Sequence, residues 1–329
     1  MNALAWLALA AASAAPAAPP APDWYRSLAS VHWVVKDVER VKQAWARLGY
    51  PALADFGDVD LTVEVRGQLT PARLRVAMAS VDGVAVYWLQ PLDGGGVYGE
   101  FLKAHGEGIF SLNHLAPSRA ALDAEVARLQ ALGVGVLQSS DVDTGEGTLR
   151  IVHMDTAGEG KWALGLVHGS VPGVPAAGPA PPLPAKLAQV AFVVRDFQAP
   201  SAYWSRLGLP ALAVSRSPIG DRLYRGQPGR FDQELAWQRH GAVAYEWIRS
   251  LAGPNVYEDF LRSHGEGVHH LGFDVADFDK AVAAWTAAGF PVVQSGTWGS
   301  PGQRGSGRYA YLDTEGAGGL YVEVLWTLR

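Results

Sequence analysis

Two stretches of this sequence decide the fold, because one repeats the other. Residues 31–53 read VHWVVKDVERVKQAWARLGYPAL, and residues 190–212 read VAFVVRDFQAPSAYWSRLGLPAL. A second pair follows at the same spacing, since VYGEFLKAHGEGI begins at Val97 and VYEDFLRSHGEGV begins at Val256. Both pairs are offset by 159 residues, and chance matches would not keep one offset over so long a stretch. The chain therefore contains two copies of one domain.

Each copy also contains a weaker repeat of its own. In the second copy, an apolar run at 187–194 leads into an amphipathic helix at 199–207 and then into strand-like segments. The same order returns with an apolar run at 268–275, a helix at 278–288 and further strands. This pattern predicts two βαβββ modules per domain. We expect an α+β fold in which the modules form a curved mixed sheet around a cleft, with helices packed on one face.

Stretches rich in Pro and Ala mark the expected domain boundaries. Residues 171–185 read VPGVPAAGPAPPLPA, which cannot hold a helix or a central strand, so we interpret them as a linker between domains at 23–170 and 186–329. Residues 1–22 combine an apolar run of signal-peptide length, small residues at 12–14 and a Pro/Ala arm. They predict export to the periplasm, or a cytoplasmic protein if the segment is not a signal. The apolar run is too short for a stable membrane span.

Composition excludes several classes of function. The chain has 27 Lys and Arg against 32 Asp and Glu, a net charge of −5, and no basic run, so nucleic acid is not an expected partner. It has no cysteine, which excludes disulfides, thiolate nucleophiles, cysteine-ligated zinc and iron–sulfur clusters. Any metal must be held by His, Asp, Glu or Gln. Because duplication places both halves of an assembly in one chain, we expect a monomer or weak dimer.

Four polar residues interrupt strand-like runs of the second copy, where inward positions are normally apolar. They are Gln189 in LAQVAFVV, Glu246 in VAYEWI, His270 in VHHLGFDV and Glu323 in LYVEVLW. The spacing from the first to the second nearly equals that from the third to the fourth, as expected if each module contributes its first and last strands. Two carboxylates, an imidazole and an amide oxygen suit a divalent metal such as Zn, Ni, Co, Fe or Mn. The alternative is that each residue forms a separate cap or pair.

These residues, with FLRSHGEGVHHLGFDV at 260–275 and YLDTEGAGGLYVEVL at 311–325, resemble the vicinal oxygen chelate superfamily. That superfamily includes glyoxalase I, methylmalonyl-CoA epimerase and extradiol dioxygenases. There the metal is held at the first and last strands of each module, which implies a tandem arrangement and a ligand set of Gln189, Glu246, His270 and Glu323. Such a set resembles that of glyoxalase I, whereas extradiol dioxygenases use two His and one Glu.

The resemblance implies a metal-dependent isomerase, epimerase or lyase that takes a proton from the carbon next to a carbonyl group. Glu323 or Glu246 would be the catalytic base. Two alternatives stay open: a binding or sequestration protein without turnover, and a dioxygenase. Export would argue against substrates built on glutathione or coenzyme A, because those thiols are cytoplasmic.

The first copy lacks the metal-binding pattern. At the four matching positions it has uncharged residues, namely Ser30, Tyr87, Ser111 and Gly165. We therefore expect a degenerate domain with a structural or substrate-shaping role. A histidine cluster is an alternative site, although no carboxylate in a matching strand completes it; the candidates are His32, His114, His153 and His168.

Other residues have weaker functional signals. His105 and His264 precede Gly in both copies, including the copy without a metal pattern, so a shared structural role explains them better than catalysis. Trp45 and Trp204 lie at helix positions and are expected in the core. A basic loop could hold an anionic small-molecule substrate, or could simply be solvated; it contains Arg216, Arg222, Arg225 and Arg230.

Overall fold

The computed structural model describes residues 19–171, 183, 185–216 and 218–329. Most of the predicted export segment and most of the predicted linker lie outside these residues, so both assignments stay predictions. Within the described part of the chain, no helix is long and apolar enough to cross a membrane.

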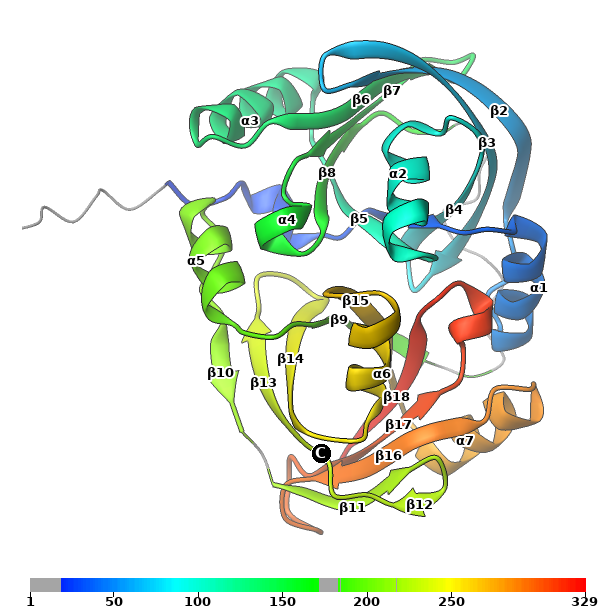
Figure 1. Ribbon diagram of the computed structural model, residues 1–329, viewed down its shortest axis with the longest axis vertical. Helices are drawn as coiled ribbons and strands as arrows, with labels where there is room; N and C mark the ends of the chain where they lie inside the picture. The colour runs from blue at the N-terminus through cyan, green and yellow to red at the C-terminus, as the bar shows by residue number, and fades with distance from the viewer. Residues whose placement is uncertain (1–18, 172–182, 184, 217) are drawn as a thin grey trace, which may run out of the picture.

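The strands of the first half close into a barrel in the order β1-β4-β3-β2-β6-β7-β8-β5 (Figure 1). Its two modules meet where their first strands, β1 and β5, pair antiparallel, while β1–β4 and β5–β8 are parallel pairs. The elements are η1 (Asp23–Arg26), β1 (Ser30–Val34), α1 (Val38–Leu48), β2 (Ala54–Val65), β3 (Gln68–Val81), β4 (Val84–Asp93), α2 (Gly96–His105), β5 (Gly108–Leu115), α3 (Arg119–Ala131), β6 (Val136–Asp143), β7 (Thr148–Met154), α4 (Ala157–Gly160) and β8 (Ala163–His168).

The second half repeats this order around a sheet arranged β10-β13-β14-β9-β15-β18-β17-β16-β11-β12. Its modules again meet through an antiparallel pair, β9 with β15, and each first strand runs parallel to the last strand of its module. The predicted α+β fold with curved mixed sheets is confirmed. The elements are β9 (Ala185–Val193), α5 (Gln198–Arg206), β10 (Ala213–Ser215), β11 (Ile219–Tyr224), β12 (Gln227–Pro228), β13 (Asp232–Gln238), β14 (Ala244–Ala252), α6 (Val256–Ser263), β15 (Gly267–Val275), α7 (Phe278–Ala287), β16 (Val292–Trp298), β17 (Gly307–Leu312), η2 (Glu315–Ala317) and β18 (Tyr321–Thr327).

In three of the four modules, an aspartate lies between the first strand and the following helix and caps the start of that helix. The Asp37 side chain accepts a hydrogen bond from the Arg40 N–H at the start of α1, and Asp277 does the same for Lys280 in α7. Such a side chain satisfies one of the free N–H groups of the first helical turn. The repeated Asp is therefore explained by helix capping.

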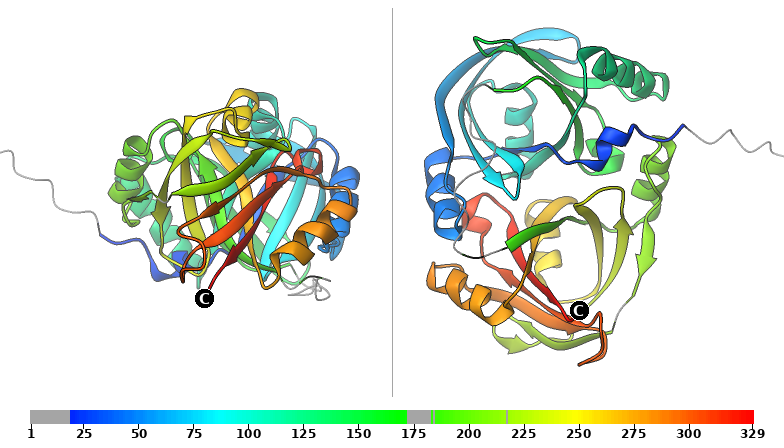
Figure 2. Two further views of the ribbon diagram at one scale, coloured as in Figure 1. Left: turned by 90° about the horizontal axis from the view of Figure 1, so that it is seen from below. Right: turned by 180° about the vertical axis from the view of Figure 1, so that it is seen from behind.

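Tryptophans join the two halves. In α1, the Trp45 indole donates to the Ala317 carbonyl at 3.0 Å, and in α5 the Trp204 indole donates to the Gly160 carbonyl at 3.0 Å. Both rings are almost fully buried, so their predicted core position is confirmed. Each helix thus packs against the opposite half, α1 against η2 and α5 against α4, and two views show these contacts flanking the junction (Figures 1 and 2).

The repeated HGEG segments also lie at this junction. The His105 Nδ1 atom lies 3.2 Å from the His264 carbonyl oxygen. Glu107 accepts from the Lys36 backbone N–H, and Glu266 accepts from the Arg195 backbone N–H, both at 2.7 Å. These contacts support the structural role expected for both histidines.

Candidate metal centre

The four predicted metal ligands come from four neighbouring strands of the second sheet. Gln189 lies on β9, Glu246 on β14, His270 on β15 and Glu323 on β18, and these strands are adjacent in the order β14-β9-β15-β18. All four residues are at least 95% buried. The structure therefore brings together residues that are up to 134 positions apart in the sequence.

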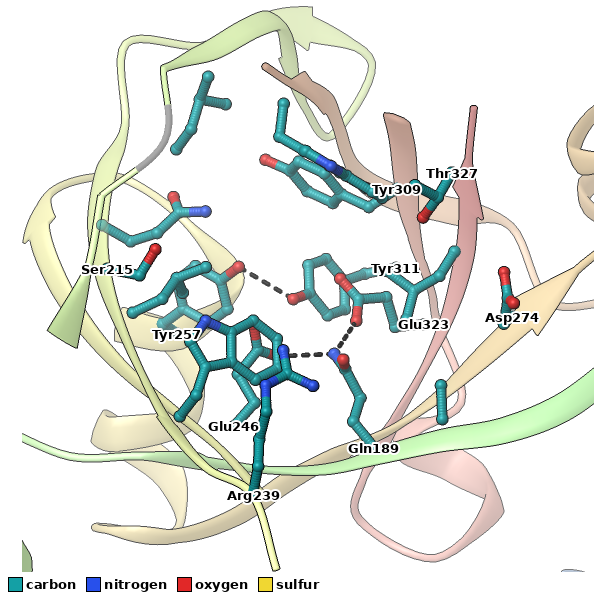
Figure 3. Close-up of a pocket in the computed structure, with 17 residues that line it drawn as sticks. Gln189, Ser215, Arg239, Glu246, Tyr257, Asp274, Tyr309, Tyr311, Glu323 and Thr327 are labelled. Atoms are coloured by element: carbon teal, nitrogen blue, oxygen red, sulfur yellow. Dashed lines mark hydrogen bonds between the residues drawn. The ribbon is translucent and has the colours of Figure 1, made fainter. Parts of the chain in front are cut away.

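The polar atoms of the four residues converge on one another. The Gln189 Nε2 atom donates to Glu246 Oε2 at 2.7 Å and to Glu323 Oε2 at 2.8 Å (Figure 3). The His270 Nε2 atom lies 3.0 Å from Glu323 Oε2 and 3.4 Å from Glu246 Oε2. We call these four residues the quartet.

The orientation of the His270 ring is set by its neighbour in the sequence. His269 Nε2 lies 3.4 Å from the Val256 carbonyl oxygen, to which it can only donate. His269 Nδ1 then accepts, and it lies 2.8 Å from His270 Nδ1. In the neutral His270 ring this arrangement places the proton on Nδ1 and leaves the Nε2 lone pair facing the carboxylates, as a metal ligand requires.

The electrostatics of the quartet fit a cation. Burial raises the pKa of Glu246, and the nearby Glu323 charge adds to this rise although a hydrogen bond with His270 opposes it. Burial by itself would lower the pKa of His270, but Glu323 and Glu246 outweigh it and raise that pKa to about 9. Two buried carboxylates thus face a single imidazole, and a divalent ion would balance their charge.

The donor atoms are also close enough for one ion. One donor atom each from Glu246, His270 and Glu323 can be chosen so that all lie within 4.8 Å of one another. Gln189 could offer its carbonyl oxygen as a fourth donor. Carboxylate, imidazole and amide donors are those that first-row divalent metals accept in proteins. The group can therefore hold a divalent metal ion.

Three residues of the quartet, Gln189, Glu246 and Glu323, line a cavity of about 490 Å³, a size typical of small-molecule sites. Several aromatic side chains face this space, among them Tyr311, whose hydroxyl lies 2.9 Å from that of Tyr257 (Figure 3). The Tyr311 ring lies 4.9 Å from the His270 ring and packs beside it. A small molecule in the cavity would thus reach the quartet.

Comparison with known proteins decides the family. Residues 30–152 and residues 188–311 each match the glyoxalase/bleomycin resistance protein/dioxygenase superfamily. The chain belongs to this superfamily. It is the vicinal oxygen chelate superfamily that the sequence resembles, and the two matched regions confirm the tandem arrangement. No curated protein matches the sequence.

Solved structures of the superfamily share the fold. A mutant of 4-hydroxymandelate synthase from Streptomyces coelicolor is 15% identical, with a TM-score of 0.61 over 94% of each chain. A xylose isomerase-like TIM barrel/4-hydroxyphenylpyruvate dioxygenase fusion protein is 14% identical, with a TM-score of 0.52 over 95% of this chain and 50% of its own. A Mn(II)-bound glyoxalase from Novosphingobium aromaticivorans is 16% identical, with a TM-score of 0.48 over 92% of this chain and 83% of its own. The first two structures carry the likeness, and at these identities it shows the fold alone.

The first half of this superfamily member fills the equivalent position differently. Ser111 Oγ donates to Asn113 Oδ1 at 2.8 Å, and Asn113 Nδ2 donates to Ser30 Oγ at 3.1 Å. A Cβ atom on Gly165 would overlap Asn113 Oδ1, so no larger side chain fits there. Among the described residues, the grouping of acidic and imidazole ligands is found in the second half. The absence of a metal from the first domain stays a prediction.

Two of the four histidines considered as an alternative site do meet. His32 Nδ1 lies 3.1 Å from His153 Nε2 and 3.2 Å from the Tyr98 hydroxyl. His114 and His168 instead contact the backbone carbonyls of other segments. Among the described residues no carboxylate joins the His32–His153 pair in a ligand cluster, which agrees with the reservation drawn from the sequence.

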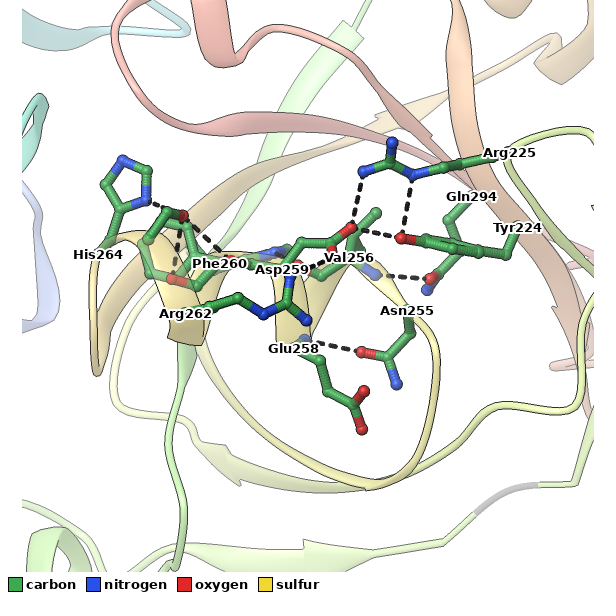
Figure 4. Close-up of polar contacts among 12 residues, drawn as sticks. Tyr224, Arg225, Asn255, Val256, Glu258, Asp259, Phe260, Arg262, His264 and Gln294 are labelled. Carbon is green, nitrogen blue, oxygen red and sulfur yellow. Dashed lines mark hydrogen bonds and ion pairs between the residues drawn. The ribbon is translucent and has the colours of Figure 1, made fainter.

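The four arginines of the basic loop do not line the cavity. Arg225 pairs with Asp259 of α6 at 3.0 Å and also donates to the Tyr224 hydroxyl (Figure 4). Arg216 pairs with Glu234 at 3.4 Å. The arginine that does line the cavity is Arg239, which the sequence analysis missed. The sequence feature that could have indicated Arg239 is its position in an alternating strand pattern along 233–239, in which every second residue lines the cavity.

Proposed function

We propose that this protein is a metal-dependent enzyme that removes a proton from the carbon next to a carbonyl group, acting as an isomerase, epimerase or lyase. The convergence of two carboxylates, one imidazole and one glutamine beside a cavity supports this proposal. A bound divalent ion would polarise the carbonyl group and stabilise the negative charge that develops as the proton leaves.

The residues of the quartet would have separate tasks. Gln189 and His270 would serve only as metal ligands, whereas Glu246 and Glu323 would bind the metal and one of them would also act as the base. The contact with His269 keeps the His270 Nε2 atom aimed at the metal. Glu323 would take the proton, since its carboxylate both contacts the imidazole and faces the cavity. Glu246 is the alternative base, because it also lines the cavity and its burial favours the proton-carrying form.

The donor set favours this chemistry over oxygen activation. Iron enzymes that activate oxygen with a facial triad use two histidines and one carboxylate. Here one histidine faces two carboxylates, and the neighbouring His269 is turned toward the Val256 carbonyl. The dioxygenase alternative is supported by the fold of solved relatives.

Metal analysis of the purified full-length protein, followed by proton exchange, tests the proposal. We expect about one divalent ion per chain, lost in His270→Ala. Methylglyoxal hemithioacetal and methylmalonyl-CoA, incubated in deuterated water with an oxygen electrode, report proton abstraction and oxygen use separately. Deuterium uptake without oxygen consumption is expected. Oxygen consumption would indicate a dioxygenase, and bound metal with neither reaction would favour a sequestration protein.

A further inference from the structure

One arginine stands unpaired beside the quartet. Arg239 is exposed and makes no hydrogen bond or ion pair with the residues that the structure describes, and its guanidinium lies 4.4 Å from the centre of the Trp237 ring. Trp237 is the direct cross-strand partner of Glu246. Because side chains two apart on an extended segment share a face, Arg239 points into the cavity beside Trp237 (Figure 3).

Two buried polar groups in the same cavity also lack partners. Neither the Tyr309 hydroxyl nor the Gln233 side-chain oxygen has a partner at hydrogen-bond distance among the described residues, although these residues are only 5% and 9% exposed. Both line the cavity. Buried polar groups in folded proteins are nearly always paired, and exceptions call for an explanation. A polar group of a ligand would supply the missing partner.

The sheet register separates these two regions. Tyr309 pairs with Leu325, two residues along from the pairing of Tyr311 with Glu323. Two strand residues span about 7 Å, so the Tyr309 hydroxyl belongs to the layer next to the quartet. Burial raises the pKa of Tyr309 and the Gln233 side chain opposes this rise, so these two side chains lie close together. Arg239 instead lies over the ring of Trp237, the cross-strand partner of Glu246. Apolar side chains flank the space between, including Leu235 and Leu325.

We propose that Arg239 binds a carboxylate of the substrate, and that Tyr309 and Gln233 bind a hydroxyl or carbonyl group at the far end of a flat apolar body. The substrate class is therefore an aromatic or similarly flat organic acid with a second polar group opposite its carboxylate. This inference rests on the proposed function, since it takes the cavity beside the quartet to be the substrate site. The expected binding site for an anionic substrate is therefore Arg239 and not the basic loop.

Isothermal titration calorimetry of the purified full chain, with the metal content of each sample measured, provides the test. The probes are 4-hydroxybenzoate, benzoate and methyl 4-hydroxybenzoate. We expect 4-hydroxybenzoate to bind most tightly. Arg239→Gln should weaken its binding by about 10- to 100-fold, because a hydrogen bond to a charged group is lost, and should leave binding of the methyl ester unchanged. Tyr309→Phe should weaken binding of 4-hydroxybenzoate and leave benzoate unchanged.

Arg304→Gln is the matched control, since it removes the same charge from an exposed position outside the cavity. The proposal is overturned if Arg239→Gln binds 4-hydroxybenzoate as the unmodified protein does, if the acid and its ester bind equally, or if none of the three probes binds. Binding that depends on Arg239 in protein unable to hold metal would support this inference and overturn the proposed function. If the protein binds metal and exchanges the substrate proton, but binds 4-hydroxybenzoate equally well without Arg239, the proposed function is supported and this inference is overturned.

Discussion

At the scale of single residues, Glu323 has the central position in the quartet. Its Oε2 atom lies 2.8 Å from Gln189 Nε2 and 3.0 Å from His270 Nε2. The Glu246 carboxylate is as close to Gln189 but 3.4 Å from the imidazole. Glu323 is also the cross-strand partner of Tyr311. Its carboxylate therefore contacts the proposed metal ligands and faces the substrate cavity at once.

Substitution of Glu323 by Gln separates metal binding from proton transfer. The amide keeps an oxygen donor and a similar volume but loses the proton acceptor, so we expect metal to remain while turnover falls by about 10² to 10⁴-fold. Metal content and exchange of the substrate α-proton with deuterated water measure the two effects.

Gln189→Glu is the control for this experiment, because it adds negative charge beside the metal and leaves the base in place. Unimpaired exchange in Glu323→Gln would move the base to Glu246. If proton exchange is also unimpaired in Glu246→Gln, neither carboxylate of the quartet is the catalytic base.

At the scale of elements, a glycine on strand β15 provides the space that the side chains of the quartet occupy. Gly272 lies opposite Gln189 on β9 and opposite Glu323 on β18. A Cβ atom at Gly272 would overlap the Gln189 side chain. The equivalent strand β5 carries Asn113 at this position, opposite Gly165 on β8. The two halves thus carry the large side chain of this pair on different strands. In the second half it is Glu323 on β18, opposite Gly272, and in the first half it is Asn113 on β5, opposite Gly165.

Gly272→Ala should therefore displace Gln189 and weaken metal binding by about tenfold or more while the sheet stays folded. The expected cause is steric, since the neighbouring side chain must move for the new methyl group to fit. Metal titration and circular dichroism measure the two properties. Gly147→Ala is the control, because a Cβ atom there would meet nothing within 4 Å. Equal metal affinity in both variants would show that Gln189 does not contribute to the site.

At the scale of the whole molecule, the two halves depend on each other while their interiors differ. Indole donors from the first half reach carbonyls of the second, as Trp33 does to Gly318 at 2.7 Å, and Trp285 of the second half donates to Leu48 at 3.0 Å. Halves expressed separately would lose these bonds and expose the rings. The monomer or weak dimer that the duplication led us to expect stays a prediction.

The first barrel should make the protein sensitive to acid. Burial lowers the pKa of His32 and of His114 from 6.5 to about 4, and it also lowers the pKa of His153 well below 6.5. Between these values the unfolded chain binds protons that the folded chain does not, so the free energy of unfolding decreases as pH falls below 6.5. The expected loss is about 1.4 kcal/mol per pH unit for each histidine.

Urea unfolding of the full chain at pH 7 and at pH 5 measures this loss. His32 faces His153, Tyr87 and Tyr98, so His32→Gln replaces one titrating group with a neutral polar one and should reduce the acid dependence. An acid dependence as steep in His32→Gln as in the unmodified protein would contradict the assignment. His105→Gln, at the exposed junction, is the control.

The duplication, the module order and the four residues that meet at the quartet could all be predicted from the sequence. These features are local or periodic: Asp37 caps the helix that follows it, and a polar residue in an apolar strand is visible without knowing its neighbours. Only the tertiary structure decided which polar groups are paired. Arg225 is paired with Asp259, whereas Arg239 forms no ion pair with the described residues and lies over the Trp237 ring. Pairing depends on strand order and register, which bring distant residues into one layer, and sequence periodicity gives the face of a strand but not its neighbour.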